Sequence, residues 1–374
     1  MQKMLEENGQ PLCFSFFILI KFFTEFNSRL TFQRPLIRYL YKKIVEMEYR
    51  RLGKSGLQVS ALSFGSWVTF GAQVNNSMAE QCMKLAYDNG VNFFDNAEAY
   101  ASGQSEIVMG ELLKKFNWDR STYTVSSKVF WGGKLPNQIG LSRKHVIEAC
   151  NAALKRLQLD YLDLYFCHRP DKNTPVEETV RAMHDLIQQG KVLYWGTSEW
   201  SGVEIMEAYS VARQYNLTPP TMEQPQYNLL CRDKVEVEYS KLYKEIGLGT
   251  TIWSPLSSGL LSGKYIDKTP EGTRLDRPGM EWLKEKIVGD ENKWKHEKVK
   301  ALKKVADDLG VSLNRLSIAW VLKNPNVSTA ILGASKTEQL EDNLKALDVV
   351  PMLTDEVMER IEAAVANKPV APAF

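Results

Sequence analysis

The sequence predicts an α/β fold, a closed (β/α)8 or TIM barrel with an N-terminal β-hairpin and an extra C-terminal helix. Short apolar runs typical of strands alternate with amphipathic stretches typical of helices, and between residues 95 and 254 successive runs end 26 to 40 residues apart. Each run is too apolar to leave one face in water, which favours a parallel sheet covered on both faces. Eight such units favour closure into one barrel, and an open doubly wound sheet is the alternative.

The elements follow in a regular order. A hairpin comes first, because YRRLGKSGLQVSAL holds two short runs around a turn from Gly53 to Gly56. The eight barrel strands are then expected to end near Gly65, Asp95, Lys128, His168, Ser198, Gln224, Ser254 and Gly333. Helices are expected over 77–89, 142–157, 175–189 and 201–215, with a last one over 354–365. Residues 255–295 break the regular alternation of strand and helix segments and predict a mobile lid or a cofactor strap.

Residues 1–46 form a leader that differs from the rest. At about 150 residues per domain the length would suggest two domains, but the regular pattern favours one barrel domain over 47–374. The leader holds seven Lys and Arg against four Glu, which leaves 40 against 41 in the other residues. A neutral body disfavours a nucleic-acid partner. We interpret the leader as an upstream start ahead of Met47 or a disordered extension; the alternative is a basic segment on an anionic membrane surface.

The leader contains one strongly apolar run, over residues 12–20. This run is shorter than the stretch of about 20 residues that spans a bilayer. Glu6 and Glu7 lie where a signal peptide would carry positive charge. Neither a spanning helix nor a signal peptide is therefore expected.

Cysteine and histidine usage indicates a reducing compartment and no metal. The five cysteines are scattered, odd in number and form no CxxC pair, which is typical of free thiols in a cytoplasmic protein. The four histidines show no spacing typical of metal ligands.

Polar residues close several of the expected strands. They are Asp95, Lys128, His168, Ser198, Gln224 and Ser254, and Tyr100 follows five residues after the first of them. Each alone has an ordinary explanation, such as a solvated lysine or a hydrogen-bonded histidine. The carboxyl ends of barrel strands meet at one end of the barrel, where active sites of this fold lie. Because several such polar residues would meet at this end of the barrel, the sequence predicts an active site there.

These residue types suit proton transfer to a carbonyl oxygen. A phenol with a pKa of about 10 is a weak acid, and an adjacent ammonium from Lys128 would stabilise the anion of Tyr100. Asp95 would hold that lysine in a buried ion pair. His168 would donate a hydrogen bond to the substrate oxygen. None of these groups supplies a reductant, so a cofactor must provide the hydride.

The cofactor is expected at the last two strands. No GxGxxG motif follows an early strand, which disfavours a dinucleotide site of the doubly wound type. Barrels frequently bind phosphate with the loops after strands seven and eight and the start of a helix. Candidate ligands there are residues 253–257 with Lys264, then Gly333, Ser335 and Lys336 leading into a helix with Gln339 and Asn343; Arg274 adds a further charge.

Seven segments resemble the aldo-keto reductases, and among them the branch of voltage-gated potassium channel beta subunits and their bacterial relatives. The segments are GSWVTFG (65–71), FFDNAEAYASGQSE (93–106), SSKVFWGG (126–133), LDLYFCHRPD (162–171), GKVLYWGTSEW (190–200), WSPLSSGLLSGKY (253–265) and LGASKTEQLEDN (332–343). The resemblance covers 48–368. It implies a catalytic tetrad of Asp95, Tyr100, Lys128 and His168, with Tyr100 as the general acid.

The resemblance also implies a nicotinamide cofactor, typically NADPH/NADP+. The matching positions are Ser66, Trp67, Gln73, Asp95, Ser198, Gln224, Trp253, Ser254, Pro255, Leu256, Ser257, Ser258, Lys264, Arg274, Gly333, Ser335, Gln339 and Asn343. Aromatic candidates for the substrate pocket are Phe70, Phe130, Trp131 and Trp200.

Three positions depart from the channel branch. His168 stands where animal channel subunits commonly have Asn, which favours turnover over cofactor sensing. Glu199 stands where Arg is usual, which puts one contact to the cofactor phosphates in doubt. Asn96 replaces the usual Thr or Ser.

Two functions of different classes follow. The first is an NADPH-dependent reductase of aldehydes or ketones, whose physiological substrate the permissive aromatic loops do not identify. The second is an NADP(H)-binding cytoplasmic beta subunit that regulates a potassium channel, with slow or vestigial catalysis. The analogy with the channel branch implies a homotetramer. A barrel with only a structural role is disfavoured by the polar strand ends.

Overall fold

The computed structural model describes residues 47–67, 69–70, 76–266, 273, 275 and 280–371. The predicted leader, Gln73 and Arg274 lie outside these residues.

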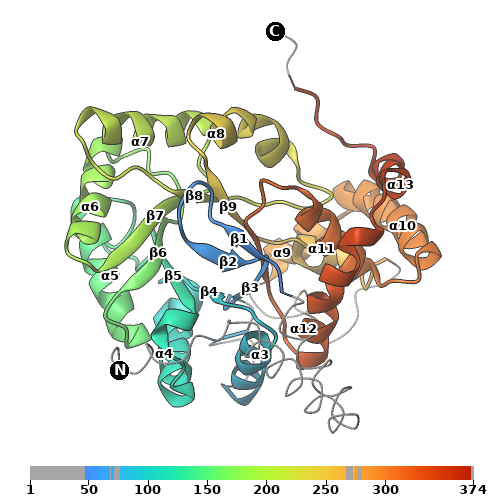
Figure 1. Cartoon of the computed structure of the whole chain (residues 1–374), viewed down its shortest axis with the longest axis horizontal. Coiled ribbons are helices and arrows are strands. Elements are labelled where there is room, and N and C mark those ends of the chain that lie inside the picture. The colour runs from blue at the N-terminus through green and yellow to red at the C-terminus, as the bar shows by residue number, and fades with distance from the viewer. Residues whose placement is uncertain are drawn as a thin grey trace, which may run out of the picture. The chain divides into compact units, whose positions relative to one another are not determined.

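Within the described part of the chain, eight parallel strands close a barrel, in which β10 pairs with β3 (Figure 1). The strands are β3 Leu62–Gly65, β4 Phe93–Asp95, β5 Thr124–Val129, β6 Leu162–Cys167, β7 Val192–Ser198, β8 Met222–Gln224, β9 Gly249–Ile252 and β10 Thr329–Leu332. Each ends within two residues of its predicted position. The predicted fold class is confirmed.

A two-stranded hairpin closes the amino end of the barrel. Strands β1 (Tyr49–Arg51) and β2 (Gln58–Ser60) are antiparallel, as predicted, and lie across the centre of the ring in Figure 1. The turn residue Gly53 has a φ of +56°, and a side chain there would clash with the Gly247 carbonyl oxygen. The hairpin therefore packs backbone to backbone against the start of β9. Leu52 and Val59 belong to the same buried cluster as strand residues inside the barrel, so this end is filled by apolar side chains.

Helices surround the barrel in Figure 1. They are α3 Asn76–Asp88, α4 Gln104–Phe116, α5 Arg143–Leu157, α6 Val176–Gln188, α7 Gly202–Gln214, α8 Ser240–Glu245, α9 Glu281–Val288, α10 Lys293–Asp308, α11 Leu313–Lys323, α12 Thr337–Leu344 and α13 Asp355–Val365. The five predicted helices, the last of them α13, are all present. Ser142, Ser201 and Thr354 cap three of them with hydrogen bonds to backbone N–H groups.

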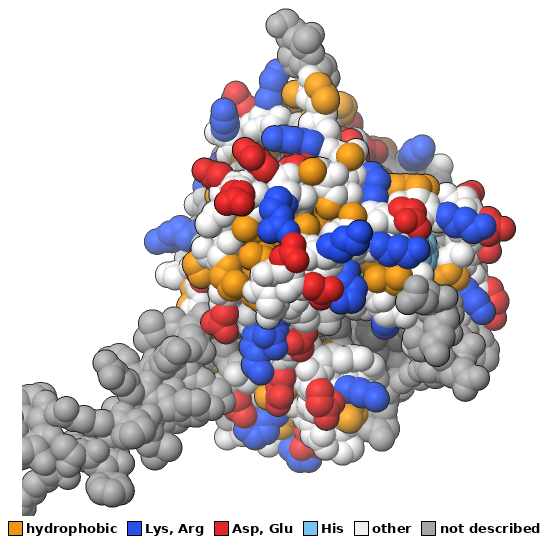
Figure 2. All heavy atoms as spheres, turned by 90° about the vertical axis from the view of Figure 1, so that its right-hand side faces the viewer, with side chains coloured by type: hydrophobic (Ala, Val, Ile, Leu, Met, Phe, Trp, Pro, Cys, Tyr) orange, Lys and Arg blue, Asp and Glu red, His pale blue; other side chains and the backbone are white. Residues whose placement is uncertain are grey.

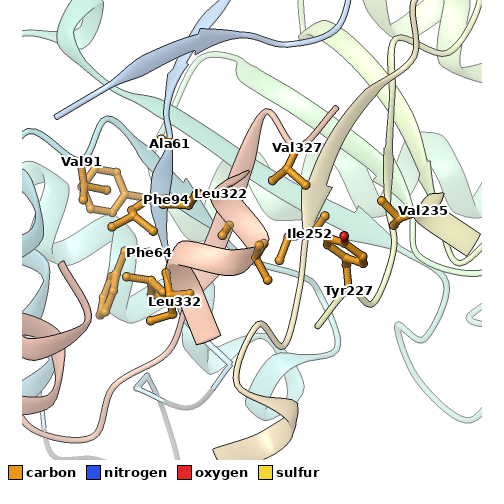
Figure 3. Close-up of a cluster of buried hydrophobic side chains, with 14 of the residues drawn as sticks. Ala61, Phe64, Val91, Phe94, Tyr227, Val235, Ile252, Leu322, Val327 and Leu332 are labelled. Carbon is orange, nitrogen blue, oxygen red and sulfur yellow. The ribbon is translucent and has the colours of Figure 1, made fainter. Parts of the chain in front are cut away.

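A continuous apolar layer joins the barrel to these helices. Figure 3 shows Phe64, Phe94 and Leu332 from neighbouring strands gathered near Leu322 of α11, all of them buried. Because strand side chains alternate between the barrel interior and this layer, both faces of each strand are covered. This explains why the strands have near-continuous apolar sequences.

The segment predicted as a lid or strap, 255–295, is partly regular. It contains a 3-10 helix at Ser257–Ser262 and helix α9, and α10 begins before its end. Residues 267–272, 274 and 276–279 lie outside the described ones, so the lid remains a prediction.

Charges of both signs are interspersed on the face shown in Figure 2. Of the helices described, none is long and apolar enough to cross a membrane. The four described cysteines, Cys82, Cys150, Cys167 and Cys231, are free thiols, and Cys13 lies outside the described residues.

Candidate active site

A buried ion pair lies at the carboxyl end of the barrel. Parallel pairing sets Asp95, the last residue of β4, opposite Ser126 of β5. Lys128 follows two positions later on the same side of β5, and its Nζ is 2.6 Å from Asp95 Oδ2. The lysine also donates to the Asn96 carbonyl oxygen at 2.8 Å, and Ser126 Oγ donates to Asp95 Oδ1 at 2.8 Å. Burial alone would lower the pKa of Lys128, but Asp95 raises it above its usual value, so the lysine is a fixed cation.

Tyr100 lies next to this ion pair, in the short 3-10 turn Tyr100–Gly103. Its hydroxyl accepts a hydrogen bond from Lys128 Nζ at 3.2 Å. Burial raises the pKa of Tyr100, Lys128 lowers it, and the net pKa lies above the usual value. The predicted lysine contact is therefore present, yet it opposes the effect of burial rather than overcoming it. The phenol keeps its proton at neutral pH, as a group that donates a proton must.

His168 follows β6 and faces Tyr100, with the two ring centroids 5.8 Å apart. Its Nδ1 is buried and has no hydrogen-bond partner in the described part of the chain. Burial, then the charges of Lys128 and Arg169, hold its pKa well below the usual value. The imidazole is neutral at neutral pH and carries one N–H that can donate to an oxygen.

One amide and one hydroxyl side chain connect the cluster of Asp95, Lys128 and Tyr100 to strands β7 and β8. Gln224 Nε2 donates to Asp95 Oδ1 at 3.1 Å across the barrel interior. Ser198 Oγ donates to the Gln224 carbonyl oxygen at 2.9 Å. The structure therefore brings the predicted residues of β4, β5, β7 and β8 to one end of the barrel.

The loop after β9 is tightly wound. Ser254, Ser257, Ser258 and Gly259 all have positive φ angles, between +48° and +94°. Ser254 Oγ accepts a hydrogen bond from the Ser258 backbone N–H at 2.9 Å. Lys264 folds back onto Gly259, where an added Cβ would lie 3.2 Å from its Nζ.

The loop after β10 is joined to the loop after β3. Thr69 Oγ1 donates to the Ala334 carbonyl oxygen at 2.6 Å. Gln339 Oε1 accepts from both the backbone N–H and the hydroxyl of Ser335, at 3.0 and 3.1 Å. Gly333 and Lys336 are exposed beside them. The start of α12 is thus shaped by residues that the sequence predicts as cofactor ligands.

Three buried polar atoms lack a partner among the residues described, two from predicted cofactor-binding residues and one from the predicted catalytic histidine. They are Ser66 Oγ, His168 Nδ1 and Asn343 Oδ1. An unpaired buried polar atom is costly, so such atoms indicate a ligand that would pair with them. Trp67 lies nearby, with its ring 6.4 Å from that of Tyr100. These residues fit a nicotinamide dinucleotide, which carries many hydrogen-bonding groups.

Glu199 plays a part that the sequence did not reveal. Its Oε1 accepts hydrogen bonds from Trp253 Nε1 at 2.9 Å and from the Gln226 N–H at 2.6 Å. Its Oε2 is 2.9 Å from Lys234 Nζ. Burial alone would raise the pKa of Glu199, but these contacts lower it below its usual value. The carboxylate thus holds Trp253 in place, and Lys234 balances its charge; no sequence signal joins residues 35 positions apart.

The predicted pocket aromatics separate into two pairs. Phe130 and Trp131 begin a small loop whose bridge joins Trp131 to Ile139. The Trp131 ring is 5.0 Å from the His168 ring and is 41% exposed. Glu98 fixes this loop, because its Oε1 accepts from the Phe130 N–H at 2.7 Å.

Phe70 and Trp200 lie in the hydrophobic core instead, 1% and 2% exposed. Phe70 packs edge-on against Phe64 of β3. The Trp200 carbonyl oxygen accepts from Tyr239 OH at 2.5 Å. Both side chains are buried among neighbouring elements, and their place in the substrate pocket stays a prediction.

In the described ranges, no group of three His, Cys, Asp or Glu lies close enough to hold a metal ion. A model of the aldo/keto reductase family matches residues 61–366, which include all eight barrel strands but not the hairpin of β1 and β2. The chain therefore belongs to the aldo/keto reductase family, and this membership indicates an oxidoreductase that acts on a small carbonyl substrate with a nicotinamide cofactor.

Proposed function

We propose that the protein reduces aldehydes or ketones to alcohols with NADPH. The observation that carries this proposal is the triple contact of Lys128, whose Nζ binds Asp95, the Asn96 carbonyl oxygen and the Tyr100 hydroxyl. A buried ammonium held in this way serves a reaction better than it serves stability.

The residues of the chain account for the proton and for the placement of the substrate oxygen. When bound, the nicotinamide would supply the hydride to the carbonyl carbon. Tyr100 donates its proton to the carbonyl oxygen, and Lys128 stabilises the phenolate that remains. His168, being neutral, donates a hydrogen bond to the same oxygen. Solvent then returns a proton to Tyr100.

The finer features of the proposal rest on the motif resemblance and on charge. Lys264 and Lys336 are exposed near the loops after β9 and β10. Their charges could bind the additional phosphate that NADPH has and NADH lacks, which supports NADPH. The seven motifs support the channel-beta branch, a homotetramer and a cytoplasmic location. His168 supports turnover as the main role, with channel regulation as the alternative.

Fluorescence titration with NADPH and NADH, followed by a panel of aldehydes, tests the proposal. We expect NADPH to bind more tightly than NADH and to support multiple turnovers. Tight binding without turnover of any aldehyde would favour the regulatory alternative. Absence of binding to either nucleotide would refute both functions.

A further inference from the structure

Arg169, which follows His168, is a cation that the proposed reaction does not use. Its Nη1 donates to the His168 carbonyl oxygen at 2.5 Å and lies 3.5 Å from Ser198 Oγ. The guanidinium carbon is 5.2 Å from the centre of the Trp131 ring. Arg169 therefore lies among three residues that surround the site.

Arg169 has no carboxylate partner among the described residues, whereas other arginines of similar burial do. Five arginines with side chains no more than 30% exposed each pair with a carboxylate: Arg50, Arg120, Arg156, Arg232 and Arg315. Arg169 is likewise half-buried, but it forms no ion pair with any carboxylate of the described residues. The two site carboxylates are already paired, Asp95 with Lys128 and Glu199 with Lys234.

This positive charge reaches the reacting groups. Arg169 contributes to lowering the pKa of His168, after burial and Lys128. It also acts on the pKa of Tyr100, as the smallest of the effects there. Since the Lys128 charge is balanced by Asp95, Arg169 adds a net positive charge beside His168 and Tyr100.

We propose that Arg169 determines specificity by binding a carboxylate on the carbonyl substrate, so that the enzyme prefers anionic aldehydes or ketones over uncharged ones. The inference rests on the proposed reductase function. A guanidinium binds carboxylates through a planar set of N–H donors, and only Nη1 of Arg169 has a hydrogen-bond partner in the described part of the chain. The exposed Trp131 ring beside it supplies an apolar surface for the substrate body.

The test compares 4-carboxybenzaldehyde with its methyl ester, which has the same reacting group without the charge. For the wild-type protein with NADPH, we expect kcat/KM to be about tenfold higher for the acid, mainly through KM. In Arg169→Met this ratio should fall to about one, and Arg169→Lys should restore part of it. Added salt should raise KM for the acid only.

Arg181→Met is the matched control. Arg181 also stacks on an aromatic ring, 4.4 Å from that of Tyr215, but it lies on α6 and pairs with Glu177. This variant should keep the wild-type ratio. Because the ratio compares two substrates on one preparation, partial unfolding of a variant does not change it.

Other outcomes identify which claim fails. If the wild-type protein reduces neither compound, the proposed reductase function is wrong. If it reduces both and Arg169→Met leaves the ratio unchanged, the specificity role is wrong. If Arg169→Met weakens NADPH binding in a fluorescence titration and lowers both activities equally, Arg169 serves the cofactor and the inference is overturned.

Discussion

The two faces of strand β5 carry the same kind of charge pair with different surroundings. On the inner face, Lys128 pairs with Asp95 and also reaches the Tyr100 hydroxyl. On the outer face, Ser127 Oγ donates to Glu106 at 2.6 Å, and Arg156 Nε pairs with the same carboxylate at 2.6 Å. Both carboxylates are buried, but only the inner pair adjoins a proton donor and an unpaired histidine nitrogen.

The comparison separates a reactive pair from a structural one. Burial raises the pKa of Glu106, and Arg156 and Ser127 oppose that rise. Each carboxylate oxygen of Glu106 has a partner, Ser127 of β5 at Oε1 and Arg156 of α5 at Oε2. The outer pair joins α4 and α5 to the barrel wall. The inner pair directs one lysine contact toward the barrel mouth. A buried ion pair alone therefore does not indicate catalysis, and the proposed role of Lys128 rests on its further contact with the Tyr100 hydroxyl.

The largest expected effect comes from removing the inner cation. Lys128→Met should lower kcat for aldehyde reduction by about 1000-fold, equivalent to about 4 kcal/mol, because Tyr100 loses the group that stabilises its anion. Steady-state NADPH oxidation measures it, with circular dichroism to confirm folding. A variant that is folded and fully active would contradict the assignment.

The matched change on the outer face should affect stability instead. Arg156→Met leaves the Glu106 carboxylate buried without its cation, and the free energy of unfolding should fall by about 2–3 kcal/mol. Urea denaturation measures the loss. The activity per folded molecule should stay within about twofold of wild type. A loss of kcat comparable to that of Lys128→Met would remove the distinction between the two faces.

Strand β8 offers the same contrast, with Gln224 facing the site and Glu223 facing the helices. Burial raises the pKa of Glu223 to about 8. A carboxyl with a raised pKa stabilises the fold fully below its unfolded pKa of about 4.3, and this contribution is lost as pH rises toward 8. Glu223→Gln cannot ionise and keeps a neutral partner for Thr197. Its stability relative to wild type should rise between pH 5 and 8, by roughly 3–4 kcal/mol.

Thermal unfolding at several pH values measures this gain. Glu359→Gln, at an exposed position of α13, serves as the control and should show no such trend. A Glu223→Gln variant less stable than wild type by the same amount at every pH would show that its hydrogen bond with Thr197, rather than ionisation, governs the site.

The smallest expected effects come from the two serines of β5. Ser127→Ala removes one hydrogen bond to Glu106 and should cost about 1 kcal/mol of stability with little change in kcat. Ser126→Ala removes one hydrogen bond to Asp95, at a similar cost, and should lower kcat several-fold because Lys128 is held less firmly. Equal kcat values for the two variants would argue against this difference.

The sequence predicted the features that depend on order along the chain. Strand ends such as Asp95 and Ser198 came from apolar runs that stop at a polar residue, and a barrel brings such ends together by its topology. The helix over 142–157 came from its Ser cap and apolar spacing, and α5 begins one residue later.

Features that depend on side-chain direction or distant pairing could not be predicted. Nothing in the local pattern says whether an aromatic near a strand end points to the barrel mouth or into the core, so the burial of Phe70 and Trp200 could not be foreseen. The Glu199–Lys234 pair joins the end of β7 to the π-helix Lys234–Glu238 after β8. Among the arginines described that are not exposed, Arg169 differs in having no carboxylate partner. Alternation could have separated Ser126 from Ser127, since neighbouring strand residues face opposite sides.

Isotope transfer tests the central claim most directly, that this site moves a hydride to a carbonyl carbon while Tyr100 protonates the oxygen. NADPH deuterated at the transferred position is incubated with 4-nitrobenzaldehyde, and the alcohol is analysed by mass spectrometry. We expect one deuterium on the carbinol carbon, and Tyr100→Phe should slow its formation by about 1000-fold while leaving NADPH affinity near wild type. An alcohol without deuterium, or an equal rate in Tyr100→Phe, would contradict the account.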